Sequence, residues 1–125
     1  MMENILAVGV GGALGSILRY VVVLASTAWF GKGFPWGTLI VNVLGSAAIG
    51  IAFVVLHERA LLGENWRYFF MTGILGGFTT FSAFSLETML LLEQHAYLRA
   101  VTNIVLSVAL CVAAAAGAAM LARRF

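Results

Sequence analysis

The sequence predicts an all-α integral membrane protein in which four helices cross the bilayer. Apolar residues make up 62% of the chain and charged residues only 10%, and the mean hydropathy is +1.04. A soluble domain carries about a quarter of its residues as Asp, Glu, Lys or Arg. The apolar residues fall into four long segments, each near or above the ~20 residues that cross a bilayer as a helix. The 125 residues are enough for one domain only.

We expect the four spans at residues 5–30, 36–56, 68–92 and 100–122 of a single transmembrane domain, residues 1–125. Arg19 is the only charge in the first span and Glu87 the only charge in the third, whereas the other two have none. Tryptophan and tyrosine flank the short connections, as in interfacial belts. Because the N-terminus has no basic region and the first apolar run is too long, we expect no cleaved signal peptide.

The basic residues give the chain only a weak preferred orientation. With four spans, the N-terminus, the second connection and the C-terminus share one side of the membrane. That side carries four basic residues, Arg59, Arg67, Arg123 and Arg124, and the other carries two, Lys32 and Arg99, with Arg19 nearby. So small a bias predicts insertion in both orientations and hence an antiparallel dual-topology homodimer, with a single fixed topology as the alternative. The scattered charges make nucleic acid an unexpected partner.

Small residues recur at intervals of four in three of the predicted helices. The pairs are Gly11 and Gly15, Ser46 and Gly50, and Gly73 and Gly77. In lipid, such pairs let helices approach closely, because packing replaces the hydrophobic effect as the cause of association. They predict a tight bundle, and ordinary helix packing without any pore function is the favoured explanation for them.

The third span contains a sequence that is unsuited to a continuous helix. Gly76 and Gly77 are followed closely by Thr79 and Thr80, and both residue types lower helix stability. We predict a break around residues 76–80, with a simple kink as the alternative. Non-helical backbone at membrane depth is tolerated only inside protein or beside a watery cavity. Carbonyls freed at the break would favour a cation, and freed N–H groups an anion.

Aromatic and hydroxyl side chains follow the predicted break. Phe81 and Phe84 are three residues apart and share a helix face. Ser82 and Ser85 form an adjacent row of hydroxyls. An aromatic pair at this spacing is typical of a packed core, but here it lies beside polar groups. Ring edges and hydroxyls both offer positive charge to an anion.

Polar side chains also interrupt the second and fourth spans. Asn42 is a lone amide in the second, and Asn103, Ser107 and Cys111 recur every four residues on one face of the fourth. Polar groups at membrane depth almost always face the bundle interior or an aqueous cavity. Cys111 is the only cysteine, which excludes a disulfide within the chain. We expect no enzyme, since no nucleophile, base and oxyanion-stabilising group converge.

The chain resembles the Fluc fluoride channels, also called CrcB proteins, over essentially its whole length. The most specific match is Gly76-Gly77-x-Thr79-Thr80-Phe81-Ser82-x-Phe84-Ser85-x-Glu87. Supporting matches are Gly11-Gly12-x-x-Gly15 followed by Arg19, and Gly37-Thr38-Leu39-x-x-Asn42.

The resemblance implies a channel that exports fluoride passively across the cytoplasmic membrane, built as an inverted homodimer with two pores in the lipid bilayer. Its pore residues would be Asn42, Phe81, Phe84, Ser82, Ser85, Asn103, Ser107 and Cys111. It also implies a structural sodium ion at the dimer interface, held by the backbone carbonyls of Gly76 and Thr79. Arg19, Glu87 and Thr80 would serve a vestibule or the structure. Family members often carry serine at the position of Cys111, so this chain departs from them there.

Two other functions fit a small four-span protein. A proton-coupled multidrug exporter of similar size relies on a carboxylate deep in its first helix, where this chain has only Arg19. A non-transporting assembly subunit would explain the small-residue faces, but it gives the broken third span no purpose.

Overall fold

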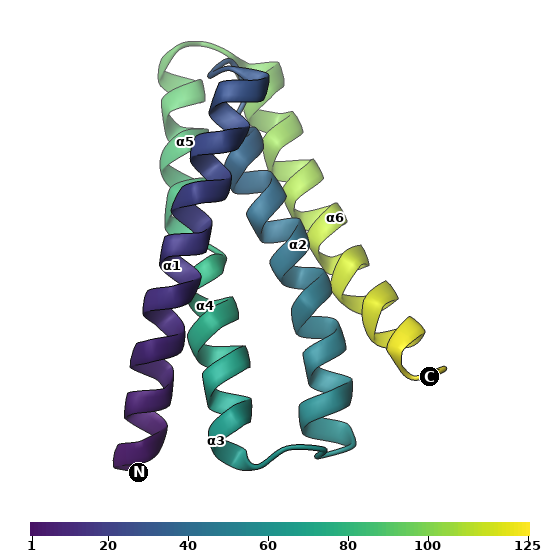
Figure 1. Cartoon of the computed structure of the whole chain (residues 1–125). Coiled ribbons are helices and arrows are strands. Elements are labelled where there is room, and N and C mark those ends of the chain that lie inside the picture. The colour runs from purple at the N-terminus through teal and green to yellow at the C-terminus, as the bar shows by residue number, and fades with distance from the viewer.

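The computed structural model describes residues 1–125, and all of its regular elements are helices. The first long helix is α1 (Met2–Phe30) and the last is α6 (Tyr97–Ala122). Between them, the second consists of α2 (Trp36–Ala52) and the π-helical η1 (Phe53–Glu58), and the third of α3 (Glu64–Arg67), the π-helical η2 (Tyr68–Leu75), α4 (Gly76–Phe78) and α5 (Phe81–Glu93). Figure 1 shows these rods running up and down side by side.

All four rods are long and apolar enough to cross a membrane. By length and composition the candidate spans are Met2–Phe30, Trp36–Glu58, Glu64–Glu93 and Tyr97–Ala122, the shortest having 23 residues. At about 1.5 Å per residue, each covers the ~30 Å of hydrocarbon in a bilayer. The predicted all-α membrane architecture with four spanning helices is confirmed.

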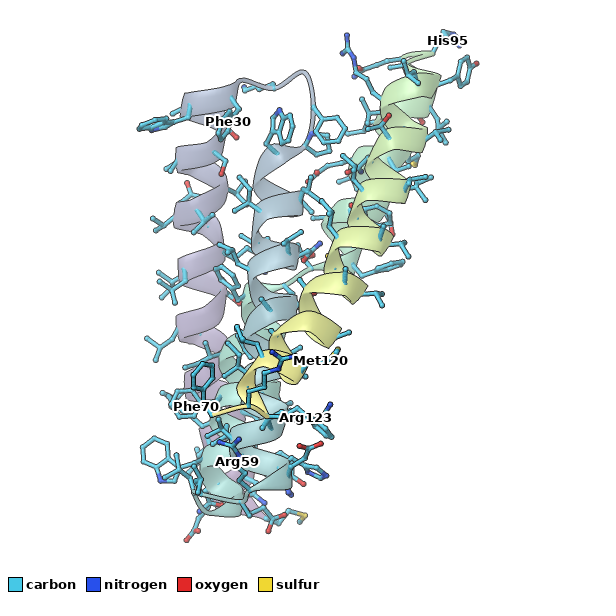
Figure 2. The ribbon with its side chains drawn as sticks, turned by 90° about the vertical axis from the view of Figure 1, so that its right-hand side faces the viewer. Phe30, Arg59, Phe70, His95, Met120 and Arg123 are labelled. Carbon is cyan, nitrogen blue, oxygen red and sulfur yellow. The ribbon has the colours of Figure 1, made fainter.

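Side-chain contacts hold the N-terminus, the second connection and the C-terminus at the same end of the bundle. The amide of Asn65 donates to Glu3, and Arg59 donates to the backbone carbonyl of Ala122. Arg123 forms a two-pronged ion pair with Glu58, with a shortest distance of 2.7 Å. Figure 2 shows Arg59 and Arg123 at this end and Phe30 and His95 at the other. Consecutive spans therefore run in opposite directions, as the predicted topology requires.

Apolar side chains cover the outside of the bundle. Only 19 of the 125 residues are buried, and many large apolar residues, such as Leu14, Ile17 and Val21, are about half exposed. Six of the buried residues carry polar side chains, among them Thr38, Thr80, Thr88, Asn103 and Ser107. This distribution suits a protein whose solvent is lipid, because polar groups at membrane depth need partners inside the bundle.

The predicted small-residue pairs lie where helices touch. Two segments of the third long helix, η2 and α4, pack on α1. The fourth long helix, α6, packs on α2. The Cα of Gly11 faces Gly73, and a Cβ at Gly73 would lie 3.0 Å from the Cα of Gly11. Gly50 of α2 packs against the backbone of Ala115 in α6. These contacts explain the glycine spacing by close backbone approach.

Candidate functional site

The third long helix is interrupted at two residues in the middle of its length. Helix α4 ends at Phe78, Thr79 and Thr80 have extended backbone, and α5 begins at Phe81. The interruption therefore falls at the C-terminal end of the predicted range, residues 76–80. Gly76 and Gly77 remain helical, so the break involves only the last two residues of that range.

The second glycine of that pair serves close packing instead. A Cβ on Gly77 would lie 2.6 Å from the carbonyl oxygen of Gly12 in α1. Gly76 is exposed, and a Cβ there would meet nothing closer than the Met71 carbonyl at 3.9 Å. The threonines make the break because a neighbouring helix satisfies the backbone groups that it exposes.

Asn42 of α2 provides the hydrogen-bond partners for these backbone groups. Its Oδ1 accepts a hydrogen bond from the backbone N–H of Thr80 at 2.7 Å, and its Nδ2 donates to the carbonyl of the same residue at 3.0 Å. One carboxamide thus pairs with both polar groups of a single extended residue, as a neighbouring β-strand would. Because Thr80 is buried, with 8% of its surface exposed, these groups would otherwise lack partners at membrane depth.

The two sides of the break have opposite electrostatic character. The Thr80 hydroxyl caps α5 by accepting from the N–H of Ala83 at 3.2 Å. On the other side, the carbonyls of four consecutive residues, 76–79, accept no hydrogen bond from the chain. The end of α4 therefore presents partial negative charge, and the start of α5 partial positive charge.

An open groove of about 350 Å³ runs along the break between α2, α5 and α6. It brings together five predicted pore residues from three helices: Asn42, Phe81, Phe84, Ser107 and Cys111. Gly76, Thr79 and Thr80 line the same groove. The ring centroids of Phe81 and Phe84 are 5.3 Å apart, and 77% of the Phe81 surface is exposed. The sequence spacing thus corresponds to a real convergence of aromatic and hydrogen-bonding groups.

Three of the predicted pore residues do not line this groove. Ser82 and Ser85 are exposed on α5, and Ser85 donates to the carbonyl of Phe81 at 3.0 Å. Asn103 of α6 is buried, with 2% of its surface exposed, and its side chain contacts α5. The four-residue spacing therefore continues along α6, but its first member lies behind the groove wall.

Arg19 and Glu87 line a second cavity, of about 400 Å³, on the α1 side of the break. Thr38 donates a hydrogen bond of 2.6 Å to Glu87 Oε1, while Oε2 is buried without a partner. No ion pair joins Arg19 to Glu87. Thr80 lines both this cavity and the groove, so the break lies between the two spaces.

Comparison with known proteins places this architecture in a family. The profile of the CrcB-like protein, Camphor Resistance (CrcB) family matches residues 6–119. The chain belongs to the CrcB family. A CrcB relative from Rhizobium meliloti is 51% identical over 110 residues, which are 87% of each chain. Relatives from Caulobacter sp. and Shewanella pealeana are 46% and 44% identical, over 98% and 89% of this chain and 97% and 89% of their own lengths. All three are named as fluoride-specific ion channels FluC.

Two residues near the CrcB site carry contacts that sequence reasoning assigned to no site. Thr38 appeared only as part of a matching motif, although its hydroxyl is the sole partner of Glu87. Thr88 belongs to none of the motifs described above, although it is buried and accepts a hydrogen bond from Asn103 at 3.0 Å. Thr88 follows Phe84 by one helical turn, and this spacing was the available signal.

Proposed function

We propose that this CrcB protein is a fluoride-selective channel that lets fluoride leave the cytoplasm passively. The observation that carries the proposal is the 44–51% identity to three fluoride-specific channels over most of their length. An inside-negative potential favours anion exit by about 2.3 kcal/mol per 100 mV, so export needs no other energy source. The four apolar helices make the chain a multi-pass membrane protein, and in bacteria this membrane is the inner one.

The groove offers fluoride the groups that a small, strongly hydrated anion needs. The amide of Asn42 and the hydroxyl of Ser107 line the groove, and Phe81 and Phe84 add ring edges. We propose that these groups replace the water of the ion during passage, with Cys111 at the far end of the row. A conducting site must bind strongly enough to admit the ion and weakly enough to release it.

The proposed pore needs a second copy of the chain, because the groove is open along one side. Phe81 directly follows the break and is largely exposed, and lipid alone would leave the polar groups beside it without partners. The near balance of basic residues between the two ends supports an antiparallel arrangement. The test is to place one reporter on the C-terminus and find its side. Antiparallel pairing requires roughly equal amounts of the reporter on the two sides of the membrane. Reporter on one side alone would exclude it.

A sodium ion on the axis of that dimer is the further proposal for the break. Four consecutive carbonyls at residues 76–79 lack donors, and they include those of Gly76 and Thr79. Carbonyl oxygens suit hard cations, and the end of α4 adds negative potential. If sodium sits there, replacing it with N-methylglucamine should lower the melting temperature of the dimer, whereas an unchanged value would argue against the site.

The two other functions have less support. A proton-coupled exporter needs a carboxylate deep in its first helix, and α1 has Arg19 there while Glu3 lies at its exposed end. A non-transporting subunit would have no use for the groove.

Growth on fluoride tests the proposed function in cells. In a bacterium that lacks its own fluoride exporter, expression of this chain should restore growth at fluoride concentrations that otherwise stop it. Phe81→Ile should restore growth less well at equal expression, because it removes a ring edge from the groove but keeps an apolar side chain. Absence of rescue by the correctly inserted wild-type protein would contradict the function, and equal rescue by Phe81→Ile would contradict the placement of the pore.

A further inference from the structure

Behind the groove wall, three buried polar side chains form a continuous line of hydrogen bonds. Ser107 donates to Asn103 Oδ1 at 3.4 Å, Asn103 Nδ2 donates to the Thr88 hydroxyl at 3.0 Å, and Thr88 donates to the carbonyl of Phe84 at 2.8 Å. The exposed fractions of Thr88, Asn103 and Ser107 are 7%, 2% and 8%. The line begins and ends at residues of the groove, Ser107 and Phe84, but its middle members do not line it.

The direction of these hydrogen bonds matters for an anion. A hydroxyl has one hydrogen to donate, and Ser107 donates its own to Asn103. In this arrangement Ser107 turns only oxygen lone pairs toward the groove, and lone pairs repel fluoride. To bind fluoride, Ser107 must turn its hydrogen outward. If nothing else changed, Asn103 Oδ1 would then be buried without a donor, which is costly.

A half-turn of the Asn103 carboxamide removes that cost. With its ends exchanged, Nδ2 donates to the oxygen of Ser107, and Oδ1 accepts from the hydroxyl of Thr88. The Thr88 hydroxyl then no longer donates to the carbonyl of Phe84. That carbonyl lies within helix α5. Three hydrogen bonds exist before the turn and three after it, the third being from Ser107 to fluoride. No covalent bond changes, and every hydrogen stays on its own atom.

We propose that Asn103 and Thr88 are positioning residues that turn the hydroxyl of Ser107 toward a passing fluoride ion and return it afterwards. The inference rests on the proposed fluoride channel function and deepens it. It gives Asn103 a role that fits its burial, because it acts through Ser107 without meeting the ion. The balance of hydrogen bonds lets the site bind and release fluoride without leaving a buried polar atom unpaired.

The test compares single-channel fluoride currents of variants at Thr88. Thr88→Val removes the partner of Asn103 in both arrangements, so it should lower the unitary current about fivefold, the effect of one lost hydrogen bond. It should also raise the half-saturating fluoride concentration. Thr88→Ser keeps the hydroxyl and should restore both values. The control is Ser26→Ala, which removes another buried hydroxyl, one that donates only to the Val22 carbonyl of its own helix, and it should leave the current unchanged.

A second arm separates positioning from simple structural support. If Thr88 acts through Ser107, then Thr88→Val should cause no further loss in a Ser107→Ala background, since coupled residues are not additive. Asn103→Leu, a near-isosteric apolar change, serves the same cycle if Thr88→Val does not fold. Independent, multiplying losses in this cycle would overturn the inference, as would a wild-type current in Thr88→Val. If the wild-type protein itself passes no fluoride, the proposed function fails, and that outcome is distinct from either result.

Discussion

Replacing Asn42 by alanine should destabilise the backbone conformation at the break in the third helix. It should lower both the stability of the protein and its fluoride conduction. The change leaves the N–H and the carbonyl of Thr80 buried without partners, because both are bonded only to this carboxamide. Each unsatisfied group costs roughly 1–3 kcal/mol. We expect a large drop in melting temperature, measured by size-exclusion chromatography after heating. Fluoride flux should fall tenfold or more, because Phe81 directly follows the break.

Two further variants make this prediction specific. Asn42→Asp keeps an acceptor for the Thr80 N–H but loses the donor to its carbonyl, so its stability should lie between wild type and Asn42→Ala. Asn65→Ala is the control, since it removes an exposed asparagine with a single hydrogen bond of 3.1 Å to Glu3. Equal melting temperatures for Asn42→Ala and Asn65→Ala would show that the carboxamide does not hold the break.

Gly15→Val should prevent α1 from packing on the third helix and so abolish most of the folded protein. A Cβ at Gly15 would collide with the Ile74 carbonyl oxygen and lie 2.9 Å from the backbone nitrogen of Phe78. These are backbone atoms of η2 and α4, which cannot rotate away as a side chain can. Overpacking in a core commonly costs 1–3 kcal/mol, and a clash between helix backbones lies at or above the top of that range.

The same substitution at Gly9 provides a matched control on the same helix. A Cβ at Gly9 meets nothing within 4 Å. Gly9→Val therefore makes the same change in helix propensity and side-chain size as Gly15→Val, but it causes no clash. The yield of monodisperse protein in detergent measures both variants. We expect it to be near wild type for Gly9→Val and severely reduced for Gly15→Val. Similar yields from the two would mean that α1 does not approach the third helix through Gly15.

The parts of the fold that depend on composition along the chain could be predicted from the sequence. Long apolar segments separated by short charged connections determine four spanning helices in a bilayer, whatever their packing. The break was also predictable, because glycine and threonine together weaken a helix. The sequence could not narrow the predicted range to Thr79 and Thr80, because glycine weakens a helix as threonine does, and yet Gly76 and Gly77 remain helical.

The contacts that organise the site could not be predicted, because they join residues far apart in the sequence. Asn42 and Thr80 are separated by 38 positions and Thr38 and Glu87 by 49. A lone polar residue in an apolar span signals that a partner exists without saying which one. Helical spacing likewise placed Asn103 on the same face as Ser107, but it could not show that α5 covers only the first of them.

Fluoride efflux from liposomes tests the central claim most directly. Purified protein is reconstituted at low density with internal fluoride or chloride, and valinomycin with a potassium gradient drives anion exit. A fluoride channel predicts rapid loss of fluoride from every liposome that holds an active dimer, and no loss of chloride above that of protein-free liposomes. Retention of fluoride by liposomes that contain folded dimer, or equal loss of both anions, would contradict it.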